Sequence, residues 1–221
     1  DRISKSFLTN KKITVLNKIN YKFKKGKIYS LVGPSGSGKS TLLNLLSLID
    51  KPSKGSIKIA NKNVNFSDSI SNDITRANKI GIIYQQNNLL PDFTALENVY
   101  LARLSIDNNK NKAVDDANKI INKMGLSKRV DHYPSELSGG EMQRIAIARA
   151  LINEPEIILA DEPTGSLDQT TAKEVFKILY KLKNLNRLII YATHNRFFAN
   201  MADCKLEIID GNIKNINVKN K

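Results

Sequence analysis

The chain has 221 residues, 41% of them hydrophobic, and a formal net charge of +14. This length and apolar content are enough to fill the core of one large domain or two small ones, which argues against an intrinsically disordered chain. The single cysteine, Cys204, excludes an internal disulfide, and together with His132 and His194 it does not offer the clustered ligands of a metal site.

The positive charge does not predict a nucleic-acid partner. Lys and Arg neutralise phosphates, but here Lys far outnumbers Arg and accompanies abundant Asn and Ile, residues with A/T-rich codons. On a surface that recognises bases, Arg would be expected to be more frequent than Lys. We therefore attribute the charge to genome composition, and we note that a basic surface suits the anionic cytoplasmic leaflet of a membrane.

Membrane-spanning and secretory segments are not indicated by the sequence. It holds no apolar run of the roughly 20 residues that a span needs, and its N-terminus lacks an apolar signal region. We expect a soluble protein of cytosolic type.

The first elements along the chain are predicted to be strands. Apolar residues fall largely on alternate positions over residues 15–23, and Ile28–Val32 is a short apolar run that ends at a glycine. An apolar helix is predicted to open at Thr41, and Ile80–Tyr84 has the composition of a buried parallel strand.

A helical insertion is predicted from about residue 90 to residue 150. Apolar residues recur at helical spacing over residues 113–124, and Gly125 follows as a stop signal. The polar stretch Asn108–Lys112 is predicted to be a loop.

The last part of the chain alternates between strands and a helix. The predicted elements are the strand Ile157–Ala160, a helix over residues 175–182, the strand Leu188–Ala192, and a hairpin formed by Lys205–Ile209 and Ile213–Val218. Strands that alternate with helices predict an α/β fold with a mostly parallel sheet.

A phosphate-binding loop is predicted between the strand Ile28–Val32 and the following helix. Its glycines let backbone N–H groups turn toward phosphate oxygens, while Lys39 would reach the β and γ phosphates and Ser40 would ligate Mg²⁺. A chance match is disfavoured by this strand-to-helix context. The loop consists of Gly33, Pro34, Ser35, Gly36, Ser37, Gly38, Lys39, Ser40 and Thr41.

Two adjacent carboxylates follow the apolar strand Ile157–Ala160. Asp161 would hold Mg²⁺, and Glu162 would polarise the attacking water, as expected of a Walker B element. The pair would otherwise be read as a solvated turn, an interpretation that the P-loop makes much less attractive.

The sequence Leu137-Ser138-Gly139-Gly140-Glu141 resembles the signature motif of ABC transporter ATPases. P-loop, signature and Walker B occur in the order found in that family. The resemblance implies that Ser138 and the N–H groups of Gly139 and Gly140, at a helix start, bind the γ-phosphate of ATP held by the P-loop of a second subunit.

The resemblance covers essentially the whole chain and implies further site residues. Phe7 falls where the family stacks an aromatic ring on adenine, although a core or edge-strand aromatic is the alternative. Gln85 resembles the Q-loop glutamine that touches Mg²⁺ and water, with Gln86 as a neighbouring candidate. Asp168 lies in a D-loop-like segment, and His194 resembles the switch histidine at the γ-phosphate, followed by Asn195 where many relatives carry Asp.

Three segments narrow the resemblance to one group within the family. Leu89–Val99, Pro134–Glu136 and Leu206–Glu207 resemble the lipoprotein-releasing ATPases of Gram-negative bacteria. Macrolide exporters and cell-division ABC ATPases share many of these residues and remain alternatives. A soluble nucleic-acid-associated ABC ATPase is a weaker alternative, because such proteins commonly carry two ATPase domains.

What the resemblance implies is one ABC domain over residues 1–221, with a RecA-like P-loop core and an antiparallel β edge at 1–88 and 153–221 and a helical subdomain at 89–152. Two copies would close around two Mg-ATP and drive transmembrane permease subunits, which would bind the lipoprotein cargo. The protein would lie peripherally on the cytoplasmic face of the inner membrane. The surface around Gln85 and the segment Leu89–Tyr100 is predicted to dock on the permease, unless the apolar side chains of that segment pack the subdomain instead.

Overall fold

The computed structural model describes residues 1–8 and 11–218, which form two compact units. Unit 1 comprises the described residues up to 73 and from 183 onward, and unit 2 comprises residues 74–182. Helix α2 (Ser69–Lys79) contains the boundary between them. The division into a core and a helical subdomain at residues 89 and 152 stays a prediction.

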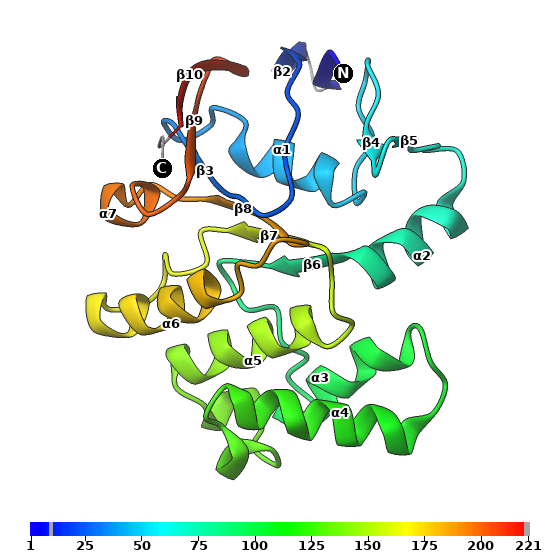
Figure 1. Ribbon diagram of the computed structural model, residues 1–221, viewed down its shortest axis with the longest axis vertical. Helices are drawn as coiled ribbons and strands as arrows, with labels where there is room; N and C mark the ends of the chain where they lie inside the picture. Colours follow the sequence, from blue (N-terminus) through cyan, green and yellow to red (C-terminus); the bar gives the residue numbers. More distant parts are fainter. Residues whose placement is uncertain (9–10, 219–221) are drawn as a thin grey trace. The chain divides into compact units, whose positions relative to one another are not determined.

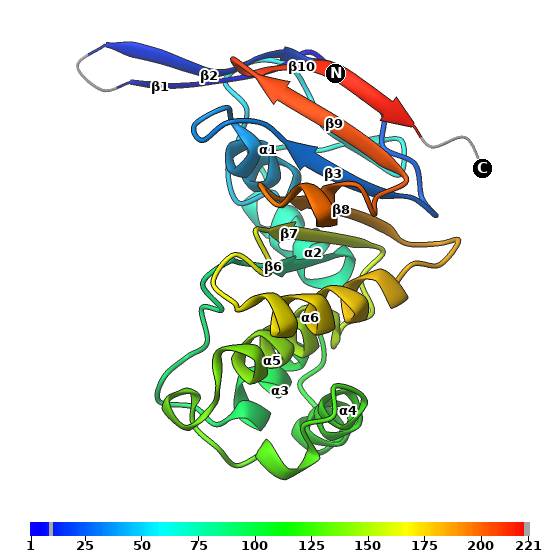
Figure 2. The same ribbon diagram turned by 90° about the vertical axis from the view of Figure 1, so that its left-hand side faces the viewer.

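Unit 1 is built on strands in the order β10-β9-β3-β8. Strand β3 is parallel to both of its neighbours, and β9 and β10 form an antiparallel hairpin (Figure 2). All residues of β8 are buried, as expected of a strand covered on both faces. These strands are β3 (Ile28–Val32), β8 (Leu188–Ala192), β9 (Cys204–Ile209) and β10 (Asn212–Val218).

A second, antiparallel hairpin opens unit 1, formed by β1 (Ile3–Leu8) and β2 (Lys12–Ile19). The predicted strand over residues 15–23 was therefore wrong in its bounds. Strand β2 ends at Ile19, and the rings of Tyr21 and Phe23 pack edge-to-face on Tyr29, at centroid distances of 6.0 and 5.0 Å. Tyr21 and Phe23 therefore contribute to this aromatic cluster and not to the face of a strand. The remaining elements are α1 (Lys39–Leu46), β4 (Lys58–Ile59), β5 (Lys62–Asn63) and α7 (Arg196–Ala199).

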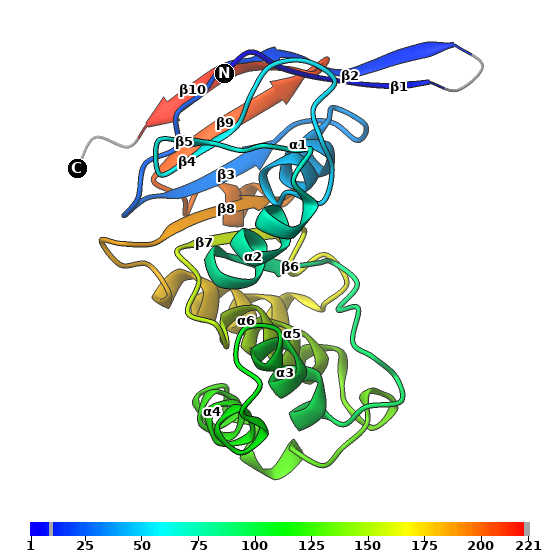
Figure 3. The same cartoon turned by 90° about the vertical axis from the view of Figure 1, so that its right-hand side faces the viewer.

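Unit 2 combines a parallel strand pair with packed helices. Helix α5 contacts α3 and α4 on one side and α6 on the other (Figures 1 and 3), and side chains such as Val99, Ile121 and Ile145 are fully buried between α3, α4 and α5. The elements are β6 (Ile80–Ile83), β7 (Ile157–Asp161), α3 (Ala95–Leu104), α4 (Lys110–Lys123), α5 (Gly139–Leu151), α6 (Gln169–Lys181) and two 3₁₀ turns, Ser127–Arg129 and Pro134–Glu136.

Helix α4 shows how a cap overrides polar composition. The predicted loop Asn108–Lys112 was wrong for its last three residues, because the Asn109 side chain accepts a hydrogen bond from the Lys112 N–H at 3.1 Å and starts the helix there. The predicted end was right, since the helix caps at Met124 and Gly125 adopts φ 73°. Within residues 1–8 and 11–218, no helix has both the length and the apolar character needed to cross a membrane.

Candidate functional site

The predicted phosphate loop of unit 1 leads from β3 into α1. Helix α1 begins at Lys39, two residues before the predicted Thr41, and its N-cap is Gly38. Gly38 offers no side chain to cap the helix, so the first backbone N–H groups stay available to a ligand. Gly36 and Gly38 adopt φ 76° and 104°, which only glycine reaches without strain.

Glycine is also required by close packing around the loop. A side chain at Gly33 would collide with the carbonyl oxygen of Ile208, and one at Gly38 would lie 2.5 Å from a methyl group of Leu16 on β2. Gly36, by contrast, faces open space. The loop is therefore fixed from behind by β2 and β9 and open on its outer side.

Ser37 and Lys39 lie against the loop itself, whereas Ser35 and Ser40 are exposed. Lys39 Nζ donates hydrogen bonds to the carbonyl oxygens of Gly33 and Pro34, both at 2.9 Å. The Ser37 hydroxyl is buried, and among the described residues it has no hydrogen-bond partner. A buried hydroxyl without a partner and a lysine curled over the loop are what a bound phosphate would use, so the loop fits the predicted ligand.

His194 follows the strand next to the one that carries the phosphate loop. Leu31 of β3 pairs in parallel with Ala192 of β8, so Gly33 and His194 each lie two residues beyond the same pair. The Thr193 N–H donates to the Leu31 carbonyl oxygen at 3.1 Å and extends the pairing toward the histidine. The carboxyl ends of parallel strands are where ligands bind in open α/β sheets.

The residue after His194 has a structural role that the sequence did not indicate. The Asn195 side chain caps α7 by accepting a hydrogen bond from the Phe197 N–H at 2.9 Å. Asn and Asp serve equally well as caps. The departure from the family's usual Asp therefore leaves this turn intact.

Phe7 lies at the exposed end of β1. It pairs with Ile13 of β2, two residues from Val15, whose carbonyl oxygen would lie 3.0 Å from a side chain at Gly38. The residue is 41% exposed, which argues against a core aromatic, whereas the alternative of an edge-strand aromatic stays open. Phe7 thus lies, exposed, on the hairpin whose strand β2 contacts the phosphate loop at Gly38.

In unit 2, the Q-loop and Walker B residues follow a parallel pair in the same way. Ile83 of β6 pairs with Ala160 of β7, so Gln85 and Glu162 each lie two residues beyond it. The Gln85 side-chain nitrogen would touch a side chain at Gly165 at 3.0 Å. The choice of Gln85 over Gln86 as the Q-loop residue stays a prediction. Glu162 adopts the left-handed φ of 45°, a conformation that strains a residue other than glycine.

The signature segment forms a capping box at the start of α5. The Ser138 hydroxyl accepts from the Glu141 N–H at 3.3 Å, and Glu141 Oε2 accepts from the Ser138 N–H at 2.9 Å. Arg129 Nε donates to the other carboxylate oxygen of Glu141 at 2.9 Å. The hydrogen bond from the Ser138 backbone, followed by that from Arg129, lowers the pKa of Glu141 to about 2.

The signature glycines face α6 and the segment just before it. A side chain at Gly140 would collide with the Thr171 methyl group, and one at Gly139 would lie 3.4 Å from Leu167. Asp168 caps α6, accepting hydrogen bonds from the N–H groups of Thr170 and Thr171 at 3.0 and 3.1 Å, and hydrogen bonding from Thr171 lowers the pKa of its carboxyl. The sequence did not predict this capping role.

The predicted residues therefore form two groups, one in each unit. The P-loop, Phe7 and His194 lie in unit 1, and Gln85, Asp161, Glu162, the signature and Asp168 lie in unit 2. The hydroxyl of Ser40, the amide oxygen of Gln85 and the carboxylate of Asp161 are the oxygen donors that Mg²⁺ prefers. Their meeting on one ion stays a prediction.

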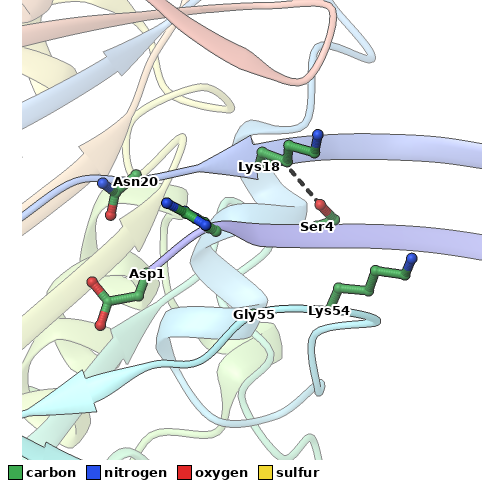
Figure 4. A pocket seen from close by; sticks show the side chains of 7 residues that line it. Asp1, Ser4, Lys18, Asn20, Lys54 and Gly55 are labelled. Atoms are coloured by element: carbon green, nitrogen blue, oxygen red, sulfur yellow. Dashed lines mark hydrogen bonds between the residues drawn. The ribbon is translucent and has the colours of Figure 1, made fainter.

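Unit 1 also has a pocket that contains none of the predicted site residues. It lies at the base of the β1–β2 hairpin, where the Lys18 N–H donates to the Ser4 hydroxyl at 3.0 Å (Figure 4). Its basic side chains do not converge on one point, and the Asp1 carboxylate already pairs with Lys58 at 3.1 Å. We assign no ligand to it. The lining residues are Asp1, Arg2, Ser4, Lys18, Asn20, Lys54 and Gly55.

Known proteins resemble the chain over nearly its full length. Residues 16–165 match the family model described as ABC transporter. The lipoprotein-releasing system ATP-binding protein LolD of Rickettsia bellii is 47% identical over 195 residues, covering 88% of this chain and 86% of that protein. The LolD protein of Ehrlichia ruminantium (strain Gardel) is 45% identical over 217 residues, covering 96% and 94%.

A solved structure is similar in fold as well as in sequence. The dimeric post-hydrolysis state of the ATP-binding cassette MJ0796, bound to ADP and Pi, superposes with a TM-score of 0.92 at 34% identity, covering 100% of this chain and 98% of that one. A second dimeric structure of MJ0796, described as a bacterial ABC transporter cassette, has a TM-score of 0.91 at 35% identity.

Proposed function

The chain belongs to the ABC transporter family, and we propose that it is the ATP-hydrolysing subunit of a transporter that releases lipoproteins from the inner membrane toward the outer membrane. It is an ATP-binding cassette with ATPase activity, and its fold is that of a P-loop NTPase. The lipoprotein cargo is supported by the relatives that carry this name, at 40–47% identity over most of the chain. This part of the proposal rests on the names of these relatives and not on a binding pocket for the cargo.

Hydrolysis is proposed to depend on positioned charges. Lys39 and the N–H groups at the start of α1 would hold the β and γ phosphates. The Ser37 hydroxyl would donate a hydrogen bond to a phosphate oxygen. Ser40, Asp161 and Gln85 are the residues that would hold Mg²⁺, whose positive charge would offset the negative charge of the phosphates. Glu162 would accept a proton from the attacking water, and His194 would donate a hydrogen bond to the γ-phosphate.

A second copy of the chain is proposed to complete each site. The signature presents the Ser138 hydroxyl and the N–H groups of Gly139 and Gly140 at a helix start, which is an anion-binding arrangement. In the proposed dimer these groups would contact the γ-phosphate held by the partner's P-loop. The dimeric state of MJ0796, at 34% identity, supports this arrangement.

The permease is proposed to dock on the loop that follows Gln85. Of the four apolar side chains predicted there, Leu90 and Phe93 are exposed by 45% and 38%, whereas Leu89 and Leu96 pack against the core of α3, α4 and α5. We therefore restrict the proposed docking surface to Leu90 and Phe93. A cytoplasmic helix of the permease, apolar on one face, would suit it.

This loop is held in shape by side chains of unit 2. Arg149 donates to the carbonyl oxygens of Asn87 and Asn88, each at 2.7 Å. Asn98 accepts from the Leu90 N–H at 2.7 Å and donates to the Phe93 carbonyl oxygen at 3.0 Å. A loop fixed at both ends would transmit a displacement at Gln85 to the docked permease.

The proposal is tested by reconstitution of the chain with the membrane proteins that co-purify with it. ATP-dependent release of a radiolabelled lipoprotein from proteoliposomes is expected. Co-purification with an exporter or a cell-division complex, and no lipoprotein release, would refute the cargo while leaving the ATPase intact.

The docking surface has its own test. Leu90→Glu with Phe93→Glu should abolish permease binding and leave basal ATPase activity and folding unchanged. Leu185→Glu, at an apolar residue that is 89% exposed, is the matched control. Unchanged permease binding in the Leu90/Phe93 variant would remove this surface from the mechanism.

A further inference from the structure

Lys5 is a buried lysine on strand β1 of unit 1. The residue is only 8% exposed, and its ammonium group donates to Asp50 Oδ1 at 2.6 Å and to the Lys51 carbonyl oxygen at 3.0 Å. Lysine is rarely buried, because desolvating its charge is costly unless the charge is paired. The pairing explains how Lys5 is tolerated, but an apolar residue would fill the same space without the need for a partner.

The same ammonium group lies over the ring of Phe7. Lys5 Nζ is 4.9 Å from the ring centroid, within the range of a cation–π contact. The ring is still 41% exposed. One face of Phe7 is therefore covered by a cation whose position is fixed by Asp50, and the exposed area is left for a ligand.

The segment that holds Lys5 comes directly after the P-loop helix. Helix α1 ends at Leu46, and Asp50 follows four residues later. The same segment is bonded to β1 at two further points: the Ser4 N–H donates to the Lys54 carbonyl oxygen at 2.9 Å, and the Ser6 N–H donates to the Ser53 hydroxyl at 3.0 Å. Strand β1 is thus tied to the end of the P-loop helix on the side away from β2.

We propose that Lys5 is a positioning residue for nucleotide binding: fixed by Asp50, its ammonium group covers one face of Phe7 and holds the ring ready to stack on the adenine base. The proposal rests on the proposed function, in which Phe7 contacts adenine. A ring that is already held loses less conformational freedom when the base binds, so affinity is gained from preorganisation and not from a new contact with the ligand.

The experiment is a double-mutant cycle on Lys5 and Phe7, read out by calorimetric binding of ADP and, separately, of inorganic pyrophosphate. ADP reports on the base and the phosphates together, whereas pyrophosphate reports on the P-loop alone. Phe7→Leu is expected to weaken ADP binding about tenfold by loss of stacking. Lys5→Met is expected to weaken it about threefold in the wild-type background and to have no effect in the Phe7→Leu background.

Two controls separate this role from general charge and from folding. Lys54→Met removes an exposed positive charge from the segment whose backbone bonds to β1, and it should leave ADP binding unchanged. Pyrophosphate binding should be the same in all variants. If Lys5→Met does not fold, Asp50→Asn removes the carboxylate that fixes the ammonium group and carries the same test.

The possible failures point to different parts of the proposal. Equal weakening of ADP binding by Lys5→Met with and without Phe7, equal weakening of pyrophosphate binding, or no weakening at all would overturn the positioning role. Unchanged ADP affinity in Phe7→Leu would overturn it by removing the stacking contact, with the P-loop assignment intact. A wild-type protein that binds neither ADP nor pyrophosphate would refute the proposed function itself.

Discussion

Arg129 is paired with Glu141 through a hydrogen bond of 2.9 Å between Nε and Oε1, and it thereby secures the capping box of the signature segment from outside the helix. The guanidinium also lies 3.2 Å from His132 Nε2. Arg129 was not predicted to matter, because no sequence spacing links a 3₁₀ turn to a carboxylate of the next helix.

The Glu141 carboxylate should make the stability of the protein depend on pH in the acid range. Its pKa is about 2 in the folded protein against an ordinary value of 4.5, so its contribution is present above pH 4.5 and is lost as the pH falls toward 2. Glu141→Gln lacks this contribution, worth about 0.5–1 kcal/mol for a partly exposed pair. Urea unfolding of both proteins, from neutral pH down to the lowest pH at which they fold, should show their difference shrinking. A constant difference would mean that the carboxylate charge is not involved.

Lys39→Ala should weaken nucleotide binding by about 10- to 100-fold and abolish turnover, because charge-assisted hydrogen bonds to phosphate are lost. In the free protein Lys39 bonds only to loop carbonyl oxygens among the contacts described, so folding should be little affected. Lys62→Ala, at an exposed lysine of β5, makes the same change in net charge and is the control. ATPase activity close to that of the wild type in Lys39→Ala would refute the P-loop assignment.

Glu162→Gln should bind ATP but slow hydrolysis by about 10²- to 10⁴-fold, since the amide keeps the shape and loses the base. Gln tolerates the left-handed φ of 45° no worse than Glu does, so the loop should keep its conformation. The variant should accumulate as an ATP-bound dimer, measured by size-exclusion chromatography with light scattering. A monomer in the presence of ATP and Mg²⁺ would contradict either the dimer or the role of Glu162.

Mixing two defective subunits should restore one shared site. Ser138→Asp keeps a good N-cap but places a negative charge against the γ-phosphate, and Lys39→Ala disables the P-loop. Neither variant should dimerise alone with ATP, whereas the mixture should form a heterodimer with one trapped nucleotide. Partial ATPase activity is expected if that site can hydrolyse ATP without a second intact site. Recovery of the full rate would contradict shared sites.

Gly140→Ala should destabilise unit 2 although alanine favours a helix by about 1 kcal/mol over glycine. The added methyl group would collide with the Thr171 methyl group, which Thr171→Ser removes. Thermal unfolding should therefore show a loss in Gly140→Ala and a recovery in the double variant. Gly139→Ala, which meets Leu167 at an ordinary 3.4 Å, is the matched control. A Gly140→Ala protein as stable as the wild type would show that α6 can shift to accommodate the added methyl group.

The sequence by itself determined the features whose physics is local. The buried strand Ile28–Val32, the glycines of the P-loop and the capping box from Ser138 to Glu141 are contiguous, and the backbone conformation that each needs is set by its own residues. For this reason the fold class was predicted correctly. The family resemblance, confirmed by the match over residues 16–165, supplied the expected role of each motif.

The tertiary structure decided which distant segments meet. Contacts between residues far apart in the chain align Gly33 with His194 and place Lys5 between Asp50 and Phe7. Which face of a segment is covered decides that Leu90 is exposed while Leu89 is packed. Hydrophobic periodicity reports that a residue is apolar or buried but not which partner it meets. A buried lysine or an arginine next to a cap is therefore indistinguishable in sequence from a solvated charge until the chain has folded around it.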